Sequence, residues 1–476
     1  MHMMKMNILC NEKSTVRDAL DKINENAKGV VFIVDDNQEL KGVVTDGDVR
    51  RGLLRGVTVD ASVGEIVSRE CVYARSSDEP EKVFKRFSEK VKVIPIVNDN
   101  MQVIDYSEYN SQVKLAIAQP QLNGKELDYL LDAFLSTWIS STGKYVTQFE
   151  KEFSDYCGTK YGVATSNGTT ALHLALVVLG IGEGDEVIIP DITFAATINS
   201  VLYTGATPVI VDIEADSWCI DPDEIEKAIT EKTKAIIPVH IYGQPCDMGR
   251  IMEIAKRHNL YVVEDCAEAH GAMYAGKKVG SFGDIGCFSF FGNKVITTGE
   301  GGMCITDNQE LDQKMRIYRD HGMSRERKYY HEVVGFNYRM TNLQAAIGVA
   351  QLENIEKTLE WREELENSYR DKLNAVAEIN LQRNDLPNRK KITWLVTAYV
   401  SDEEKRDACM KAMVDANIDA RPFFVPLSEM EIYKNYVFSN KVSKDISGRG
   451  FNLPTSYVVG KEQIDKVIAA IKTVIA

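Results

Sequence analysis

From Gln121 onward, apolar runs with strand character alternate with stretches of helical periodicity. This alternation is typical of an α/β domain with a mostly parallel sheet, because parallel neighbours need a crossover connection. In such sheets, ligands bind beside the carboxyl ends of the strands. We therefore expect the functional residues of this part of the chain on loops that follow strands.

The first such loop follows the expected strand Tyr161–Ala164 and opens a strongly helical run. It contains Ser166, Gly168, Thr169 and Thr170. Free N–H groups at a helix start bind anions, hydroxyls add hydrogen bonds, and glycine lets the anion approach closely. The same residue types are also common helix caps. Taken alone, the loop is consistent with either an anion site or a simple cap.

A second loop begins at two carboxylates. The apolar strand Tyr261–Val263 leads into Glu264 and Asp265, and small residues follow. A carboxylate at a strand end suits a group that faces a bound cation. A helix N-cap explains the same residues equally well when this loop is considered alone.

The third loop, Gly286–Met303, contains a single lysine, Lys294, among apolar, aromatic and glycine residues. Low-dielectric surroundings lower the pKa of a lysine and favour the neutral amine that forms Schiff bases. Ser289 lies five residues before Lys294 and could contact a phosphate. The alternative is an exposed lysine on a hairpin.

Together the three loops offer an anion cradle, a carboxylate for a pyridinium nitrogen and a lysine that forms a Schiff base. Their order and sequence closely resemble the DegT/DnrJ/EryC1/StrS sugar aminotransferases, a branch of the fold-type I enzymes that use pyridoxal 5'-phosphate (PLP). The resemblance covers about residues 119–476. It implies a PLP-binding large domain over 119–365, with a mostly parallel sheet, and a small C-terminal α/β domain over 366–476. Further matching strings are Phe149-Glu150, Asp191–Thr197, His240–Pro245, Gly335–Thr341, Arg421–Phe423 and Asn452–Thr455.

The resemblance implies a role for each matching residue around the cofactor. Gly168 and Thr169 would bind the PLP phosphate, together with Ser289. Phe194 would stack on the pyridine ring. Asp265 would keep the ring nitrogen protonated, which makes the ring an electron sink.

The resemblance also implies the catalytic lysine and the assembly. Lys294 would bind the cofactor covalently and then move the proton between the donor carbon and the cofactor. Asn337 would reach the phosphate of a neighbouring subunit, so the enzyme would be a homodimer with shared active sites. Glutamate would be the amino donor.

Two features depart from the commonest pattern of this family. Glu268, expected beside the cofactor, stands where many members carry Gln, and Phe291–Asn293 precede the lysine where many have a His-Pro pair. Both resemble the perosamine-synthase-like branch, which aminates C4 of a GDP-linked 4-keto-6-deoxy sugar, giving an amino sugar for surface polysaccharide or glycoconjugate synthesis. The alternatives are amination at C3, a UDP- or dTDP-linked sugar, or a non-catalytic sensor that binds a nucleotide or PLP.

Residues 1–112 form a separate unit with its own pattern. A helix is expected at 16–23, strands at 29–34 and 40–44, and a helix at 48–54, and a fainter copy follows with a helix at 80–87 and strands at 91–97 and 101–104. Such a duplication indicates paired modules that complete one another's cores. The string Gly42–Arg51 closely resembles a CBS-domain module, which implies a CBS-domain pair. The polar stretch Ser107–Pro120 is the expected linker.

In the CBS family, a Thr and an Asp three positions later often hold the ribose of an adenine or guanine nucleotide. Thr45 and Asp48 match that pattern, whereas Val103–Tyr106 in the second copy does not, so we expect at most one nucleotide pocket. The alternative is that Asp46 and Asp48 only cap the following helix.

Composition excludes several other function classes. The formal net charge is −14, which disfavours nucleic acid as a partner. The nine cysteines include no Cys-x-x-Cys pair, which fits reduced thiols in the cytoplasm. No run approaches the roughly 20 apolar residues of a membrane span, and no secretory signal is recognisable. His240, His258 and His270 are far apart in the sequence, and no metal site is expected.

Overall fold

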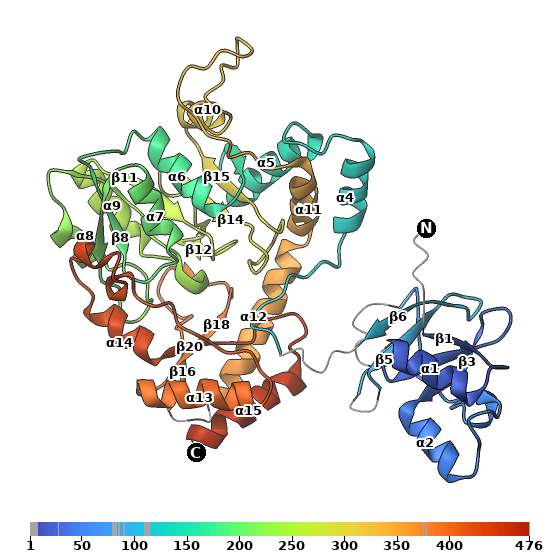
Figure 1. Cartoon of the computed structure of the whole chain (residues 1–476). Coiled ribbons are helices and arrows are strands. Elements are labelled where there is room, and N and C mark those ends of the chain that lie inside the picture. Colours follow the sequence, from blue (N-terminus) through green and yellow to red (C-terminus); the bar gives the residue numbers. More distant parts are fainter. Residues whose placement is uncertain are drawn as a thin grey trace. The chain divides into compact units, whose positions relative to one another are not determined.

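The computed structural model describes residues 8–475 except 27, 79–82, 84–85, 89–90, 109–114, 375 and 377. The chain divides into two compact units, Met1–Val113 and Lys114–Ala476 (Figure 1). None of the helices within the described ranges is long and apolar enough to cross a membrane.

Within its described residues, the first unit contains two small sheets with the same topology. In the order β1-β2-β3 the first pair is parallel and the second antiparallel, and the order β4-β5-β6 repeats this. Apolar residues from both sheets, among them Phe32 and Val97, share one buried cluster. The expected helix at 80–87 lies largely outside the described residues. The elements are β1 (Leu9–Asn11), α1 (Val16–Asn26), β2 (Val30–Val34), β3 (Leu40–Thr45), α2 (Asp46–Leu54), η1 (Val63–Glu65), β4 (Ala74–Arg75), β5 (Val93–Val97) and β6 (Val103–Glu108).

The linker prediction was wrong at its C-terminal end. Leu115 forms a parallel bridge with Ile418, and Ile117 is buried in the main core of the second unit. The Ile117 carbonyl also accepts a hydrogen bond from the backbone N–H of Thr455 at 2.7 Å. Burial of an apolar side chain of this size stabilises the unit into which it packs. Residues 115–117 therefore belong to the second unit.

The second unit is built on a seven-stranded sheet of order β7-β15-β14-β11-β10-β8-β9 (Figure 1). Only β15 runs against the other strands, so the prediction of a mostly parallel sheet is confirmed. The strands are β7 (Tyr161–Thr165), β8 (Glu186–Pro190), β9 (Thr207–Val211), β10 (Thr233–Ile236), β11 (Tyr261–Asp265), β14 (Ile285–Ser289) and β15 (Gly302–Thr306).

Helices bury both faces of this sheet. Within β8, Val187 and Ile189 join one apolar cluster, whereas Ile188 joins the other, as the alternation of side chains along a strand requires. Helices α6, α7 and α10 pack together with the first cluster, while α5, α9 and α11 contribute to the second. The helices of this part are α4 (Glu126–Leu135), α5 (Lys144–Cys157), α6 (Gly168–Val178), α7 (Ala196–Tyr203), α8 (Pro222–Ala228), η2 (Ile241–Gly243), α9 (Met248–His258), α10 (Gln309–Tyr318) and α11 (Asn342–Glu353).

The C-terminal part of the second unit has an antiparallel sheet of order β16-β18-β20-β19 and its own apolar cluster. The long helix α12 leads into it and spans the predicted domain boundary at 365–366 without a break. A small sheet of order β13-β12-β17 joins the two parts of the unit. These elements are β12 (Met273–Tyr274), β13 (Lys277–Lys278), α12 (Ile355–Leu373), β16 (Asn380–Leu381), β17 (Arg389–Lys390), β18 (Val396–Tyr399), α13 (Glu403–Asp415), β19 (Arg421–Pro422), η3 (Leu427–Glu429), η4 (Lys434–Tyr436), α14 (Lys441–Arg449), β20 (Gly450–Leu453) and α15 (Lys461–Ile475).

Candidate active site

Asp265 is the last residue of β11, and its carboxylate is buried. One oxygen accepts a hydrogen bond from the Thr197 hydroxyl at 2.8 Å, and the other accepts one from the backbone N–H of Ala267 at 3.1 Å. Burial raises the pKa of Asp265, whereas these hydrogen bonds and the nearby Lys294 lower it. The carboxylate is therefore oriented at a strand end, as the sequence predicts.

The residues of the predicted anion cradle lie where α6 begins, beside the end of β14. The Asn167 side chain accepts from the N–H of Thr170, whose hydroxyl accepts from the N–H of Asn167, so these two residues close a capping box. The next N–H groups, those of Gly168 and Thr169, have no partner within the helix. The cap and the anion site are thus compatible, because different residues provide them.

Gly168 brings this helix start against Ser289. A Cβ atom on Gly168 would lie 2.8 Å from the Ser289 Cβ, closer than real side chains come. Ser289 is the last residue of β14, so its hydroxyl lies beside the helix N-terminus. The fold thus brings three of the predicted phosphate ligands, from segments more than a hundred residues apart, to one place.

Lys294 is largely but not fully buried, with 12% of its side chain exposed. Its Nζ lies 3.6 Å from Oε1 of Glu268 and 3.9 Å from the ring centroid of Trp394. Burial lowers the pKa of Lys294, while the charges of Glu268 and Asp265 oppose this shift. The alternative of an exposed hairpin lysine is therefore wrong.

Glu268 follows β11 closely and is buried beside Lys294. Its second carboxylate oxygen accepts a hydrogen bond of 2.9 Å from the backbone N–H of Tyr242. Tyr242 adopts a positive φ of 52°, an uncommon conformation for a bulky residue, which aims this N–H at the carboxylate. Burial raises the pKa of Glu268 to about 7.

Two predicted residues lie at the surface. Phe194 precedes α7, is 63% exposed and contacts the ring of Phe424 with 6.4 Å between centroids. Asn337 is exposed, pairs with Asp320 in a β-bridge and accepts from Nε of Arg339 at 3.2 Å. Among the described residues, no hydrogen bond or ion pair joins Asn337 to Lys294 or Asp265.

In the first unit, Thr45 and Asp48 bond to each other. The Thr45 N–H and hydroxyl both donate to Asp48 Oδ2, at 2.9 and 2.6 Å, and the Asp48 N–H donates to the Thr45 hydroxyl at 3.3 Å. Arg51 donates to the other carboxylate oxygen of Asp48 at 2.6 Å. This capping box starts α2, so the pair has the geometry that the capping alternative requires.

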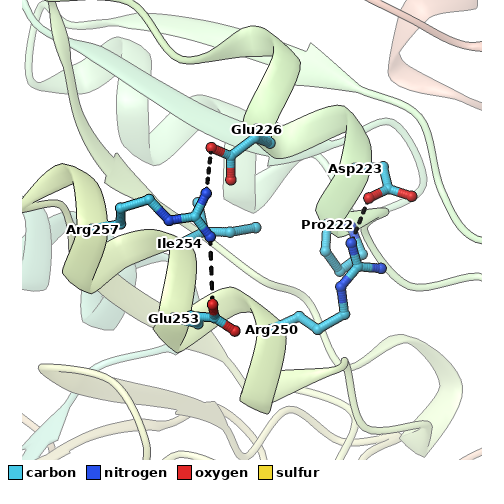
Figure 2. Close-up of a pocket in the computed structure, with 7 residues that line it drawn as sticks. All are labelled: Pro222, Asp223, Glu226, Arg250, Glu253, Ile254 and Arg257. Atoms are coloured by element: carbon cyan, nitrogen blue, oxygen red, sulfur yellow. Dashed lines mark hydrogen bonds and ion pairs between the residues drawn. The ribbon is translucent and has the colours of Figure 1, made fainter.

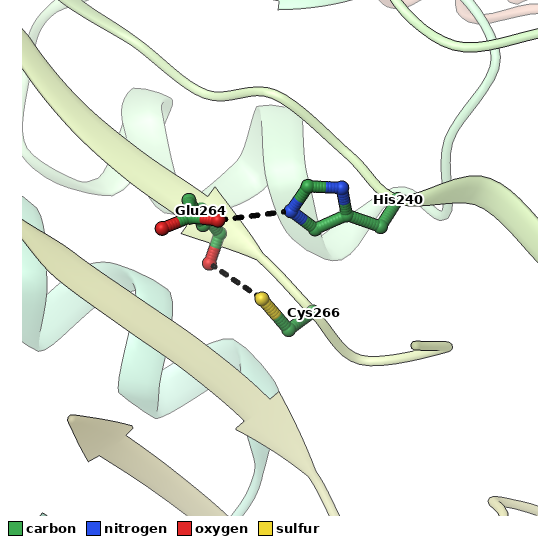
Figure 3. Close-up of side chains that lie close together, drawn as sticks. All are labelled: His240, Glu264 and Cys266. Carbon is green, nitrogen blue, oxygen red and sulfur yellow. Dashed lines mark hydrogen bonds and ion pairs between the residues drawn. The ribbon is translucent and has the colours of Figure 1, made fainter. Parts of the chain in front are cut away.

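Sequence reasoning missed a buried cluster next to Asp265. His240, Glu264 and Cys266 place ligand-type atoms within 4.8 Å of one another (Figure 3). The Glu264 carboxylate accepts the N–H groups of Gly280, Phe282 and Gly283 as well as the bond from His240, each at 2.7 to 3.1 Å. Each of the two carboxylate oxygens of Glu264 thus accepts two hydrogen bonds. These bonds hold the 280–283 loop to the end of β11.

A surface hollow of about 290 Å³ lies between α8 and α9, away from these residues (Figure 2). Its two arginines are already paired, Arg250 with Asp223 and Arg257 with Glu226 and Glu253. Carboxylates outnumber the cations there, so the hollow offers no net positive charge to a phosphorylated ligand.

Comparison with known proteins shows to which family the chain belongs. Residues 120–472 match the DegT/DnrJ/EryC1/StrS aminotransferase family. The chain belongs to this family. The aminotransferase is 47% identical over 365 residues to a GDP-perosamine synthase of Caulobacter vibrioides, covering 76% of this chain and 98% of the relative. Residues 2–55 match the CBS domain.

Solved structures agree with this assignment. An aminotransferase from Psychrobacter cryohalolentis is 34% identical, with a TM-score of 0.70 over 75% of this chain and 98% of its own. A sugar aminotransferase from Streptococcus pneumoniae in its PLP form is 29% identical, with a TM-score of 0.70 over 76% and 98% of the two chains. The aminotransferase is therefore a PLP-dependent enzyme of fold type I with an N-terminal CBS domain.

The described residues fit PLP. The free N–H groups of α6 and the Ser289 hydroxyl suit its phosphate, and Gly168 keeps that space clear of a Cβ. The buried Asp265 carboxylate suits a protonated ring nitrogen, and the buried Lys294 amine suits its aldehyde. Thr197, Tyr242 and Trp394, which sequence reasoning did not select, hold or cover these groups.

Proposed function

We propose that the enzyme transfers an amino group from glutamate to C4 of a GDP-linked 4-keto-6-deoxy sugar. The observation that carries this proposal is the 47% identity along 98% of a GDP-perosamine synthase. The resulting amino sugar would serve surface polysaccharide or glycoconjugate synthesis in the cytoplasm. The nine free cysteines, eight of them buried, suit a reducing compartment.

Each residue has a separate task in this proposal. When bound, PLP supplies an electron sink that stabilises negative charge on the donor carbon. Gly168 and Thr169 hold the phosphate through their N–H groups, with the Ser289 hydroxyl beside them. Asp265 keeps a proton on the ring nitrogen, because its charge stabilises the cation.

Lys294 carries the proton between the donor carbon and the cofactor in this proposal. Its amine lies 3.6 Å from Oε1 of Glu268, and burial lowers its pKa, which favours the neutral amine. Glu268 can hold or release a proton near pH 7. Phe194, exposed before α7, supplies an apolar face for the cofactor ring.

A homodimer with shared sites is part of the proposal. Asn337 lies at the surface, where it can reach a neighbouring subunit, and within the described part of the chain no hydrogen bond or ion pair joins it to Lys294 or Asp265. Helix α4 and the residues after it present an outward apolar stripe with spacing i, i+4, i+7, i+8 and i+11, a pattern typical of buried helix faces. The stripe contains Leu127, Leu131, Phe134, Leu135 and Trp138, each between 46% and 75% exposed.

The second small sheet of the first unit completes a CBS-domain pair in this proposal, because it repeats the topology of the first sheet and shares its core. Binding of an adenine or guanine nucleotide would have to use the acceptor capacity of Asp48 that its bonds to Thr45 and Arg51 leave over. The capping geometry favours a structural role for this pair.

The substrate assignment is tested with a panel of nucleotide-linked keto-sugars and glutamate. We expect the GDP-linked 4-keto-6-deoxy sugar to give the highest kcat/KM, and nuclear magnetic resonance of the product to place nitrogen at C4. Preference for a UDP- or dTDP-linked sugar, or nitrogen at C3, would replace this substrate while leaving the enzyme class intact. Lys294→Ala is the control, since no other residue of the site provides an amine to the cofactor.

A further inference from the structure

Trp394 contacts the catalytic lysine although a hundred residues separate them in sequence. It lies just before β18, is 4% exposed, and belongs to the C-terminal part of the second unit. Its ring centroid lies 3.9 Å from Nζ of Lys294. No feature of the sequence around it marks this residue as part of the site.

A second, independent contact joins the same two segments. The indole N–H of Trp394 donates a hydrogen bond of 2.8 Å to the backbone carbonyl of Asn293, the residue before Lys294. One side chain therefore fixes both the backbone of the lysine loop and the end of the lysine side chain.

Trp394 is itself held in place by aromatic packing. It stacks on Tyr242 with 5.9 Å between ring centroids and 15° between planes. Tyr242 in turn stacks on Phe424 and donates its N–H to Glu268. The position of the indole is thus coupled to Glu268, the second group near the lysine amine.

We propose that Trp394 is a positioning residue for Lys294. The proposal rests on the catalytic role proposed for that lysine. The lysine amine is bound to the cofactor in one part of each turnover and free in another, and it must return to the same place. Four rotatable bonds give a lysine side chain many alternatives. The indole face and Glu268 together define the place to which the free amine returns.

The indole ring of Trp394 also excludes water from the Lys294 amine. An aromatic face attracts an ammonium, which alone would raise the pKa of Lys294, whereas removal of water favours the neutral amine. Burial lowers the pKa of Lys294 and outweighs the opposing charges of Glu268 and Asp265. Loss of the ring would admit water and favour the charged amine, which cannot accept a proton.

The test compares Trp394→Phe and Trp394→Ala with Trp361→Phe, a matched change on α12, where Trp361 packs on Tyr457. The first readout is the pKa of Lys294 in the cofactor-free protein, from its rate of acetylation against pH, followed by mass spectrometry of the peptide. We expect Trp394→Ala to raise this pKa by about one unit or more, because water enters. Trp394→Phe, which keeps an aromatic face, should raise it less, and Trp361→Phe should not change it.

The second readout is steady-state kinetics. Both Trp394 variants lose the hydrogen bond to Asn293, so kcat should fall by roughly tenfold to a hundredfold, as for a misplaced reacting group, while KM for glutamate changes little. Circular dichroism confirms that each variant is folded, and Trp394→Phe keeps the test valid if the alanine variant is not. An unchanged acetylation profile together with an unchanged kcat in the folded variants would overturn the proposal. Turnover by Lys294→Ala would instead refute the role of the lysine itself.

Discussion

The hydroxyl of Thr197 donates a hydrogen bond of 2.8 Å to the Asp265 carboxylate across 68 positions of sequence. Thr197 lies in the first turn of α7 and also bonds the Thr193 hydroxyl at 2.7 Å. The strand end at Asp265 and the start of α7 are thereby joined by a buried chain of hydroxyls. Because the chain of hydroxyls ends on the carboxylate, it fixes the orientation of Asp265, the group proposed to face the cofactor ring.

Asp265→Asn should bind the cofactor but turn over slowly. A neutral amide cannot stabilise a protonated ring nitrogen, and the loss of such a partner slows a reaction on the order of a hundredfold or more. Rapid-mixing measurements of a single half-reaction with glutamate test this. Unchanged rates would mean that the carboxylate serves only to cap the turn after β11.

Thr197→Val removes one hydroxyl at nearly constant volume. Because the Thr197 hydrogen bond lowers the pKa of Asp265, its loss should raise that pKa and move the acid limb of the kcat/KM profile to higher pH. A charge-assisted hydrogen bond contributes about 1.5–3 kcal/mol, so the rate should fall roughly tenfold or more. Thr204→Val, at the end of α7, serves as the control, and an acid limb that does not move would contradict the expectation.

Glu268→Gln should alter the pH dependence of stability in the cofactor-free protein. The pKa of Glu268 rises to about 7 on folding from an ordinary 4.5, so the folded state binds more protons between these values. The wild type should then lose stability as pH rises from about 4.5 to 7, by about 3 kcal/mol for this group. Thermal unfolding of both proteins over that range measures the difference. Parallel curves would show that Glu268 is already ionised at low pH.

Mixing two inactive variants should restore activity if the site is shared between subunits. A hybrid of Lys294→Ala and Asn337→Ala chains contains one site with both lesions and one with neither. With free exchange, about half of the dimers are hybrids, so roughly a quarter of the sites should be intact, if pairing is random. Exchange is verified with tagged chains. No recovery after verified exchange would place Asn337 in its own subunit's site.

The first unit should be dispensable for the chemistry. A chain beginning near residue 111 retains Leu115 and Ile117, which pack in the second unit, together with every active-site residue. We expect its kcat to stay within about twofold of the full chain, since the units form separate cores.

Nucleotide binding by the CBS domain is tested by calorimetric titration of the full chain, and of its Asp48→Asn variant, with adenine and guanine nucleotides. Binding that needs Asp48 would refute a purely structural role for the Thr45 and Asp48 pair.

The parallel sheet and the local motifs could be predicted from the sequence because their signals are local. Apolar runs mark the strands, and Gly168, Asp265 and Lys294 stand in distinctive loops. A position after a strand does not by itself identify a functional residue. Asp191 also follows a strand, but its carboxylate accepts hydrogen bonds from Ser428 and Ser443 and anchors the C-terminal part.

The groups that tune the site could not be predicted in the same way. Trp394 reaches Lys294 only because the C-terminal part folds back onto the sheet, and no local pattern encodes that distance. The linker was placed too far along because Leu115 and Ile117 stand in a short apolar run between polar stretches, and the whole segment was assigned to the linker. The resemblance supplied the roles of Phe194 and Asn337, and their exposure in one chain explains why packing alone would not select them.

Glu264 and Asp265, the adjacent carboxylates at the end of β11, serve different purposes. Glu264 receives four hydrogen bonds in the interior, and Asp265, one position later, faces the site. Successive side chains of a strand point to opposite faces, so a shift of one residue would exchange them. Glu264 would then meet the cofactor, and Asp265 would be too short to satisfy the 280–283 loop. Insertions or deletions within β11 should therefore be far more damaging than substitutions, and strand length is itself a catalytic requirement of this enzyme.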